Sequence, residues 1–265
     1  MLLGLLSVVA PRDTAAVEVD GLYDAETIVT GQGEAERLRG FRIGLAEAIV
    51  KLSGDAQSVR SARVQQLLTR AGDFVEHYEY EDRMKGIPIH DEQGTRDRPH
   101  YLRMTFKRAE MDQALQMLGL PRWGSDRPRV IVWLGIKDSV RSYVLDSETE
   151  FGLGQREVLK SVARQRGVPL VLPAPGARAE TSVAYPDVAR GDLPRLRAAS
   201  NPYGADALLY GTLVMDKNGY WTAVWNLDWN NRVRRNEMTG VTFDVALREA
   251  IERAAKIFST SARGG

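Results

Sequence analysis

The sequence predicts a mixed α+β or α/β protein made of two small units, each a mixed sheet with helices packed on it. Several segments carry apolar residues at the spacing of an amphipathic helix, and others alternate or run continuously apolar as strands do. Between two groups of such segments lies "PRWGSDRPR" (121–129), which is rich in proline, glycine and charge and is typical of a linker. We therefore expect an N-terminal α/β unit over 17–121 and a C-terminal α/β unit over 128–265.

The first 16 residues are typical of an export signal. Residues 2–10 ("LLGLLSVVA") are apolar or small, and the small residues Ala15 and Ala16 follow. A signal peptide has an apolar stretch of about 7–15 residues before its cleavage site, whereas a membrane span needs about 20. The usual basic start is missing, and a short buried strand or helix is the alternative. We expect 1–16 to be a signal-peptide remnant cleaved near Ala16, and the protein to be periplasmic.

In the N-terminal unit, one long helix is the clearest element. It begins near Glu34, and its apolar residues share one helical face: Leu38, Phe41, Leu45, Ala48, Ile49 and Leu52. Around it we expect a strand at 27–30, a second helix at 58–69, alternating strands at 74–82 and 100–106, and a third helix at 110–118.

The C-terminal unit begins with a continuous apolar run and ends with an antiparallel meander and a helix. "RVIVWLGIK" (129–137) suits a strand buried on both faces. Asn218–Gly219 is a strong signal for a tight hairpin turn, because both residues tolerate positive φ. The other expected elements are helices at 155–166 and 193–199, a strand at 167–173, a loop at 174–192, three strands between 207 and 240, and a final helix at 243–258.

The stretch "NPYGADALLYGTL" (201–213) holds two glycines, Gly204 and Gly211, that resemble those of a phosphate-binding loop. Such a loop follows a strand and opens a helix, because the amides at the helix N-terminus face the anion. Here Gly204 precedes the strand, and Gly211 lies inside it or near its end. We therefore interpret both glycines as structural, with Gly211 at a bulge or a close approach of two backbones.

Composition excludes some chemistries. The chain has 265 residues, a formal net charge of +1 and no cysteine. Without cysteine there are no disulfides, thiol nucleophiles or thiolate metal ligands. A net charge near zero argues against nucleic-acid binding, although Arg232, Arg234 and Arg235 form a local basic run.

Two of the three histidines suggest a metal site. His90 and His100 lie near Asp91, Glu92 and Asp97, and imidazole and carboxylate groups are competent zinc ligands. However, no two histidines have the spacing of ligands on a helix, and a polar hairpin loop explains the same residues. We expect no metal and no other cofactor, and we keep His90, Asp91 and His100 as candidates if a metal is bound.

The third histidine is the best candidate for acid–base catalysis. His77 lies in an alternating strand beside Glu76 and Glu79, and a general acid or base needs an imidazole or carboxylate in a pocket. The alternative is a solvated strand face. The chain has no glycine-x-serine-x-glycine elbow, which argues against a serine hydrolase of that kind.

Three tryptophans mark the return strand of the meander. Trp221, Trp225 and Trp229 fall on one face of the strand, together with Ala223 and Leu227. This stripe is either core, packed on the final helix, or an exposed binding platform. The broad apolar face of that helix favours the core.

Several segments together resemble the bacterial DUF2066 family. They are "AERLRGFRIGLAEAIVKLSGD", the "YEY" strand, "LGLPRWGSDRPRVIVWL", "YGADALLYGTL" and the return strand with its W-x-x-x-W pattern. The resemblance covers nearly the whole chain after residue 17 and implies an exported envelope protein, with no catalytic residues to carry over. The second half is also similar to small domains of envelope assembly proteins, such as the N-terminal domain of the Tol–Pal translocation protein. That similarity is a fold-level analogy.

These observations favour an exported, non-catalytic periplasmic protein that binds another cell-envelope component, most simply an envelope protein. We expect no catalytic or cofactor-binding residues, no nucleic-acid partner and no membrane span, and the sequence does not indicate an oligomeric state. The alternative is a metal-dependent or acid–base enzyme that uses His77, or His90 and His100.

Overall fold

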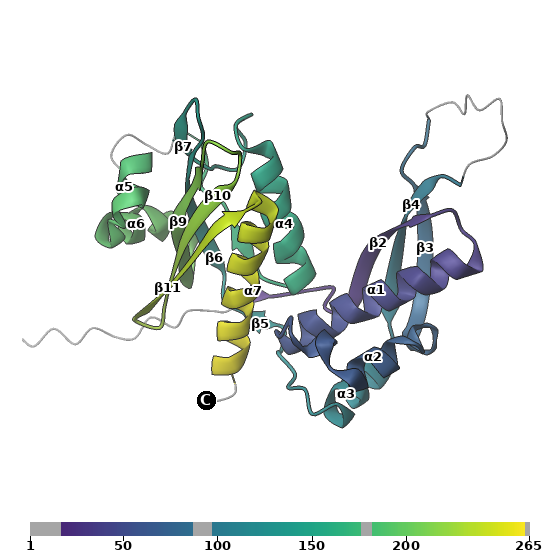
Figure 1. Ribbon diagram of the computed structural model, residues 1–265. Helices are drawn as coiled ribbons and strands as arrows, with labels where there is room; N and C mark the ends of the chain where they lie inside the picture. The colour runs from purple at the N-terminus through teal and green to yellow at the C-terminus, as the bar shows by residue number, and fades with distance from the viewer. Residues whose placement is uncertain (1–16, 87–96, 176–181, 263–265) are drawn as a thin grey trace, which may run out of the picture.

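The computed structural model describes residues 17–86, 97–175 and 182–262, which form two α+β units (Figure 1). The predicted fold class is confirmed: helices pack on mixed sheets, and the second unit ends in an antiparallel meander and a C-terminal helix. The expected signal-peptide remnant (1–16) and the candidates His90, Asp91 and Glu92 lie outside the described residues.

The first unit is a three-stranded antiparallel sheet with helices on one face. Its strands are β2 (Asp24–Thr30), β3 (Val75–Asp82) and β4 (Pro99–Phe106), in the order β2-β4-β3. Its helices are α1 (Glu34–Ser53), α2 (Ala62–Leu68) and α3 (Arg108–Met117), with short 3-10 turns at Ser58–Arg60 and Ala71–Phe74. All three helices share one apolar core with Leu102, Met104 and Phe106 of β4.

Helix α1 lies close to the sheet because two of its glycines face it. A Cβ atom on Gly40 would stand 2.5 Å from Leu102 Cδ2, and one on Gly44 would overlap the sulfur of Met104. Ala48, one turn after Gly44 on the same side of the helix, is fully buried. This close packing fixes α1 across the sheet and directs its C-terminal end toward the second unit (Figure 1).

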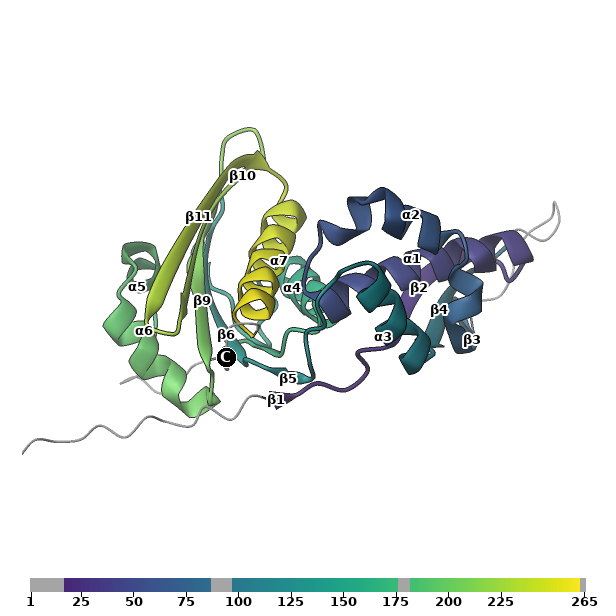
Figure 2. The same ribbon diagram turned by 90° about the horizontal axis from the view of Figure 1, so that it is seen from below.

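The second unit is a six-stranded mixed sheet covered on both faces (Figures 1 and 2). Its strands are β6 (Val130–Lys137), β7 (Ser142–Val144), β8 (Leu170–Val171), β9 (Ala207–Met215), β10 (Trp221–Trp229) and β11 (Arg232–Val241). The order is β11-β10-β9-β6-β7, and β8 pairs with β6. Helices α4 (Leu153–Arg166) and α7 (Phe243–Ser261) cover one face, and α5 (Tyr185–Arg190) and α6 (Leu193–Ser200) cover the other.

Strand β6 is buried on both faces, as its continuous apolar run predicts. It pairs in parallel with both β8 and β9, so it lies inside the sheet. Val132 and Leu134 belong to the core under α4 and α7, whereas Ile131 and Trp133 belong to the core under α5 and α6. Because side chains alternate between the two faces of a strand, the single apolar segment β6 contributes residues to two separate cores.

The glycines of the 201–213 stretch are structural, as predicted. Gly204 adopts φ +57° and ends the 3-10 turn Asn201–Tyr203. Gly211 lies inside β9 opposite Trp225, and a Cβ atom there would overlap the Val224 carbonyl of β10. Gly211 therefore permits a close approach of two backbones, and no helix follows that could face a phosphate.

The tryptophan stripe is core, as the apolar face of the final helix indicated. Trp221 and Trp225 are buried in the core that α7 covers. The half-buried Trp229 meets Phe258 of α7 edge-on, with ring centres 4.9 Å apart. The stripe thus holds α7 on the meander.

The short elements between β6 and α6 differ from the prediction. The sequence does not predict β7, and part of the expected loop at 174–192 is helix α5. Helix α5 forms because Asp187 accepts a hydrogen bond from the Ala184 amide (2.9 Å) and Val188 is buried against the sheet. The prolines and glycines around this short helix give the segment the composition of a loop.

The segment between the units is buried at their junction. Trp123 belongs to the core of the second unit, and its amide donates to the Leu52 carbonyl in the last turn of α1 (2.7 Å). Strand β5 (Asp126–Arg127) pairs antiparallel with β1 (Val17–Glu18). The units are therefore joined by packing as well as by the chain.

Arg127 is fully buried at this junction and, within the described residues, forms no ion pair with a carboxylate. Its guanidinium donates to five carbonyl oxygens at 2.8–3.1 Å, those of Lys51, Trp123, Gly124, Arg166 and Gly167. Lys51 lies in the last turn of α1 and Arg166 ends α4, so one side chain binds the C-terminal ends of a helix from each unit. Burial lowers the pKa of Arg127, and the carbonyl dipoles and the Trp123 ring, 3.7 Å away, stabilise the cation.

Candidate functional site

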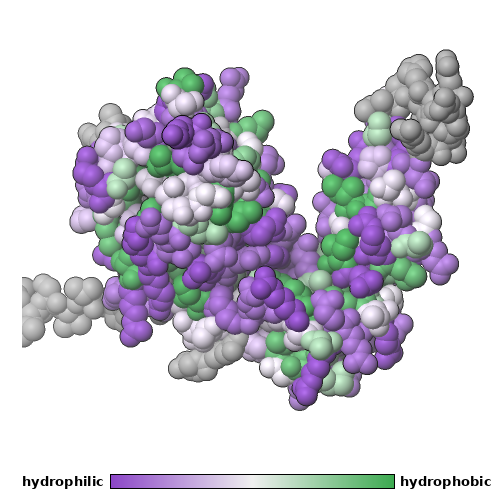
Figure 3. Space-filling model, viewed as in Figure 1, coloured by the Kyte–Doolittle hydropathy of each residue, from purple (hydrophilic) through white to green (hydrophobic). Residues whose placement is uncertain are grey.

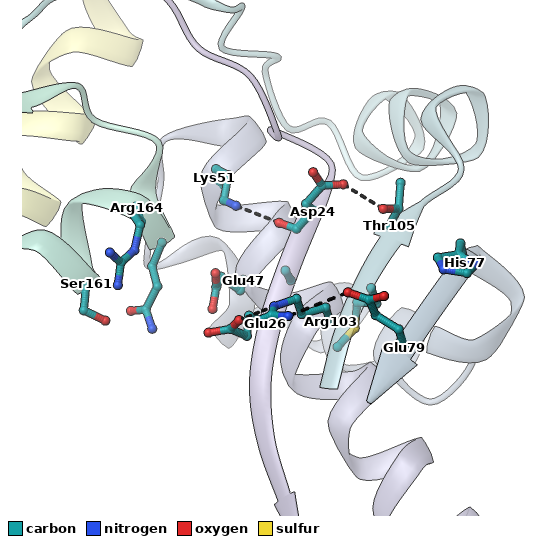
Figure 4. Close-up of a pocket in the computed structure, with 13 residues that line it drawn as sticks. Asp24, Glu26, Glu47, Lys51, His77, Glu79, Arg103, Thr105, Ser161 and Arg164 are labelled. Carbon is teal, nitrogen blue, oxygen red and sulfur yellow. Dashed lines mark hydrogen bonds and ion pairs between the residues drawn. The ribbon is translucent and has the colours of Figure 1, made fainter. Parts of the chain in front are cut away.

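A cleft of about 510 Å³ lies between the outer face of the first sheet and helix α4 (Figures 3 and 4). The outer face is the one turned away from α1, α2 and α3. The charged side chains that line the cleft are Asp24, Glu26, Glu47, Lys51, Glu79, Arg103 and Arg164. The volume falls in the range of about 300–1,000 Å³ that is typical of small-molecule sites.

On the outer face, carboxylates surround Arg103. The guanidinium lies 2.7 Å from Glu26, 2.5 Å from Glu81 and 3.7 Å from Glu79. These side chains meet because β4 pairs with β2 and β3 in a register that places Glu26 and Glu79 opposite Arg103. The hydrogen bonds from Arg103 to Glu26 and Glu81 raise the pKa of Arg103. Arg103 is therefore engaged within the sheet.

Lys51 is a buried lysine at the edge of the cleft. It lies in the last turn of α1, and 7% of it is exposed. Its ammonium group donates to the carbonyl oxygens of Asp24 (2.7 Å) and Gly21 (3.4 Å), and within the described residues no carboxylate forms an ion pair with it. Burial lowers the pKa of Lys51, and the negative charges of Glu47 and Asp24 oppose that effect.

Glu47 lies one turn before Lys51 on α1. Its side chain is half-buried and extends from α1 toward α4 (Figure 4). Burial raises the pKa of Glu47, whereas the positive charges of Lys51 and Arg166 lower it. In the part of the chain that the structure describes, the Glu47 carboxylate accepts no hydrogen bond and forms no ion pair.

Helix α4 forms the opposite wall of the cleft. Ser161, Arg164 and Gln165 line it from the C-terminal half of the helix (Figure 4). Arg166 pairs with Glu252 of α7 at 2.5 Å. Arg164 is exposed and, among the described residues, has no carboxylate partner. The cleft thus presents unpaired groups of both signs.

The structure places the two described histidines in different surroundings. His77 is exposed on the outer face of β3 and lines the far side of the cleft, opposite Thr105 of β4. His100 is buried in β4, with Nδ1 2.8 Å from the Arg98 carbonyl oxygen and Nε2 3.2 Å from the side-chain nitrogen of Gln32. Both ring nitrogens of His100 therefore have partners within the first unit.

The candidate metal ligands are only partly within the described structure. His90, Asp91 and Glu92 lie outside it, whereas Asp97 and His100 lie inside. In the described ranges, no group of three or more histidine or acidic side chains is placed to hold a metal ion. The cleft that the structure does form contains His77 but not His100.

Sequence reasoning does not identify Glu47, Lys51 and Arg164. On α1, Glu47 and Lys51 lie away from the apolar face, where charged side chains are ordinarily solvent-exposed. Here they line a cleft because α4, which comes much later in the chain, stands opposite them. No local pattern carries that information.

A family model described as "Domain of unknown function (DUF8605)" matches residues 16–124. The match agrees with the expectation of an uncharacterised family, but the model that matches is DUF8605 and not the expected DUF2066. It spans the first unit and the start of the junction segment. Of the described helices, none is both long enough and apolar enough to cross a bilayer.

No curated protein matches the chain. Among solved structures, one titled "Crystal structure of uncharacterized protein" matches at 10% identity and a TM-score of 0.19, over 52% of this chain and 92% of its own. A TM-score this low does not establish a common fold.

Proposed function

We propose that the protein is exported to the periplasm and acts there as a non-catalytic binding protein for another component of the cell envelope. The apolar segment at residues 2–10 and the small residues Ala15 and Ala16 support export. The observation that carries the binding proposal is the uncovered edge of strand β3, which offers backbone groups to an incoming strand.

Among the described strands, β3 pairs with β4 alone, and it lies on the side of the first unit away from the second (Figures 1 and 2). Just beyond β3, the Arg83 amide donates to the Pro99 carbonyl (3.2 Å). Since inward and outward residues alternate in an antiparallel pair, the backbone groups of Tyr78 and Tyr80 point away from β4. Among the described residues, no hydrogen bond reaches those groups.

The opposite edge of the same sheet is covered. Lys51, Arg39 and Glu36, all on α1, bond to outward-pointing backbone groups of β2. Arg39 donates to the Ile28 carbonyl (3.3 Å), and Glu36 accepts from the Thr30 amide (3.1 Å). The helix thus protects β2 from strand addition and leaves β3 as the open edge.

The chemistry of β3 indicates that its partner is an extended, basic segment of a different protein. Glu76, Glu79, Glu81 and Asp82 make the strand acidic. Glu79 and Glu81 share one cation, Arg103, and Asp82 pairs with Arg98, so two copies of β3 would still bring excess negative charge together. Tyr78, on the face opposite to Glu79 and Glu81, is 40% exposed and offers an apolar contact. A strand with alternating basic and apolar residues would complement both faces.

A labelled peptide of alternating lysine and valine is expected to bind the full chain saturably, as measured by fluorescence anisotropy. Changing Glu76→Lys and Glu81→Lys together should weaken binding by about tenfold, because two favourable cross-strand charges become repulsive. Both substitutions lie outside the cleft lining. Equal binding of an acidic peptide of the same pattern would contradict the proposal.

A backbone substitution separates strand addition from side-chain contact. Tyr78→Pro removes an outward amide, whereas Tyr78→Ala keeps it and loses only the ring. Peptide binding should disappear in the proline variant and persist, more weakly, in the alanine variant. Circular dichroism establishes that both variants are folded, and undiminished binding by a folded Tyr78→Pro protein would overturn the edge as the site.

Export is tested by fractionating a Gram-negative host that expresses the full chain. The protein is expected in the periplasmic fraction, with an N-terminus near residue 17 by sequencing of the purified protein. Recovery only from the cytoplasm, with Met1 or Leu2 still at the N-terminus, would exclude export.

A further inference from the structure

We propose that the cleft between the two units is a binding site for a small zwitterion with an ammonium and a carboxylate group, of the α-amino acid class. Three charged side chains line this cleft: Glu47 and Lys51 of α1 and Arg164 of α4. This binding site is independent of strand addition at β3, because those three side chains belong to other elements.

None of the three forms an ion pair within the described chain, although Glu47 and Lys51, one turn apart on α1, act electrostatically on each other. Lys51 is 7% exposed and bonds only to backbone carbonyl groups, Glu47 is half-buried without a hydrogen bond, and Arg164 has no carboxylate beside it. A buried or half-buried charge without an ion pair destabilises a fold, which applies to Lys51 and Glu47 but not to the exposed Arg164. The cost is offset if a ligand supplies the missing charges.

The signs of these groups select the ligand. A simple anion would pair with Lys51 and Arg164 and would be repelled by Glu47. A simple cation would pair with Glu47 and would be repelled by the other two. A zwitterion places its carboxylate toward Lys51 and Arg164 and its ammonium group toward Glu47, so that all three charges are paired.

The other charged side chains that line the cleft have partners within the first unit. Asp24 accepts a hydrogen bond from the Thr105 hydroxyl (2.9 Å). The other cation near β2, Arg103, is already held by Glu26, Glu79 and Glu81, so it does not compete for the ligand carboxylate. Ser161 on the α4 wall adds a hydroxyl group that can donate or accept a hydrogen bond (Figure 4). The volume of about 510 Å³ leaves room for an amino-acid side chain.

The test measures the melting temperature of the full chain with each of the twenty common amino acids at about 10 mM, a large excess for a specific site. At least one is expected to raise the melting temperature. Its N-acetyl derivative, which lacks the ammonium charge, and its amide, which lacks the carboxylate, should both give a smaller shift. The proposal is overturned if no amino acid raises the melting temperature. It is also overturned if the two derivatives raise it as much as the parent amino acid does.

Substitutions then locate the binding site by calorimetric titration. Glu47→Gln, Lys51→Met and Arg164→Gln are each expected to weaken binding by at least about tenfold, the usual effect of losing one charge-assisted hydrogen bond. Glu157→Gln on α4 and Arg248→Gln on α7 are exposed, lie outside the cleft and should leave affinity unchanged. Folded cleft variants that keep full affinity would place the ligand elsewhere. Lysine–valine peptide binding should be the same in all five variants, so the two proposals fail separately.

Discussion

Replacing Arg127 with methionine is expected to lower the free energy of unfolding by at least about 3 kcal/mol. Methionine fills much of the volume but donates no hydrogen bond, so five carbonyl oxygens at the junction lose their donor. Those of Lys51 and Arg166 lie at helix C-terminal ends, where carbonyl groups have no partner inside the helix. Urea unfolding followed by circular dichroism measures the loss.

Lysine at the same position tests the geometry of the guanidinium. Arg127→Lys keeps the charge, but one ammonium group cannot reach carbonyl groups of both helix ends as a planar fork does. Each unit has its own core, so weakening the junction should separate one unfolding transition into two. Arg70→Met, which removes an exposed ion pair with Asp73, is the matched control and should cost less than about 1 kcal/mol. Arg127 variants with the parent's unfolding curve would show that the junction does not depend on this side chain.

Local sequence patterns predict those helices and strands whose buried side can be read from the spacing of their own apolar residues. The apolar run of β6 and the spacing of α1 hold in the structure because each buries its apolar residues in a core of the unit to which it belongs. Asn218–Gly219 likewise forms the turn between β9 and β10, with Gly219 at φ +85°. The close contact between the backbones of β9 and β10 is also visible in the sequence, as Gly211, because only glycine fits there.

Contacts between the two units cannot be predicted from local sequence patterns. Trp123 and Arg127 lie in a segment with the composition of a linker, yet both are buried because the ends of α1 and α4 meet around them. Glu47 and Lys51, which line the cleft, lie on the polar side of α1, and the sequence of α1 alone predicts that this side is exposed to solvent. Conversely, His100 is a candidate metal ligand by its chemistry alone. In the structure both of its ring nitrogens lie against partners in the first unit, Arg98 and Gln32.

Replacing Trp225 with alanine is expected to cost about 3–5 kcal/mol of unfolding free energy. Trp225 is 2% exposed and lies in the core between the meander and α7. Its indole nitrogen has no hydrogen-bond partner among the described residues, so the loss comes from packing and the cavity that remains. Trp225→Phe, which keeps an aromatic ring in place, should lose markedly less.

Two measurements distinguish a core tryptophan from a binding tryptophan at this position. Tyr220→Ala, one residue before β10 and 50% exposed, should change stability by no more than about 0.5 kcal/mol, as surface substitutions usually do. If Trp225→Ala instead unfolds at the parent's urea midpoint and loses only lysine–valine peptide binding, the stripe is a recognition surface. Because Trp225 is buried in the core that α7 covers, Trp225→Ala should change the unfolding midpoint and leave the peptide affinity of the folded protein intact.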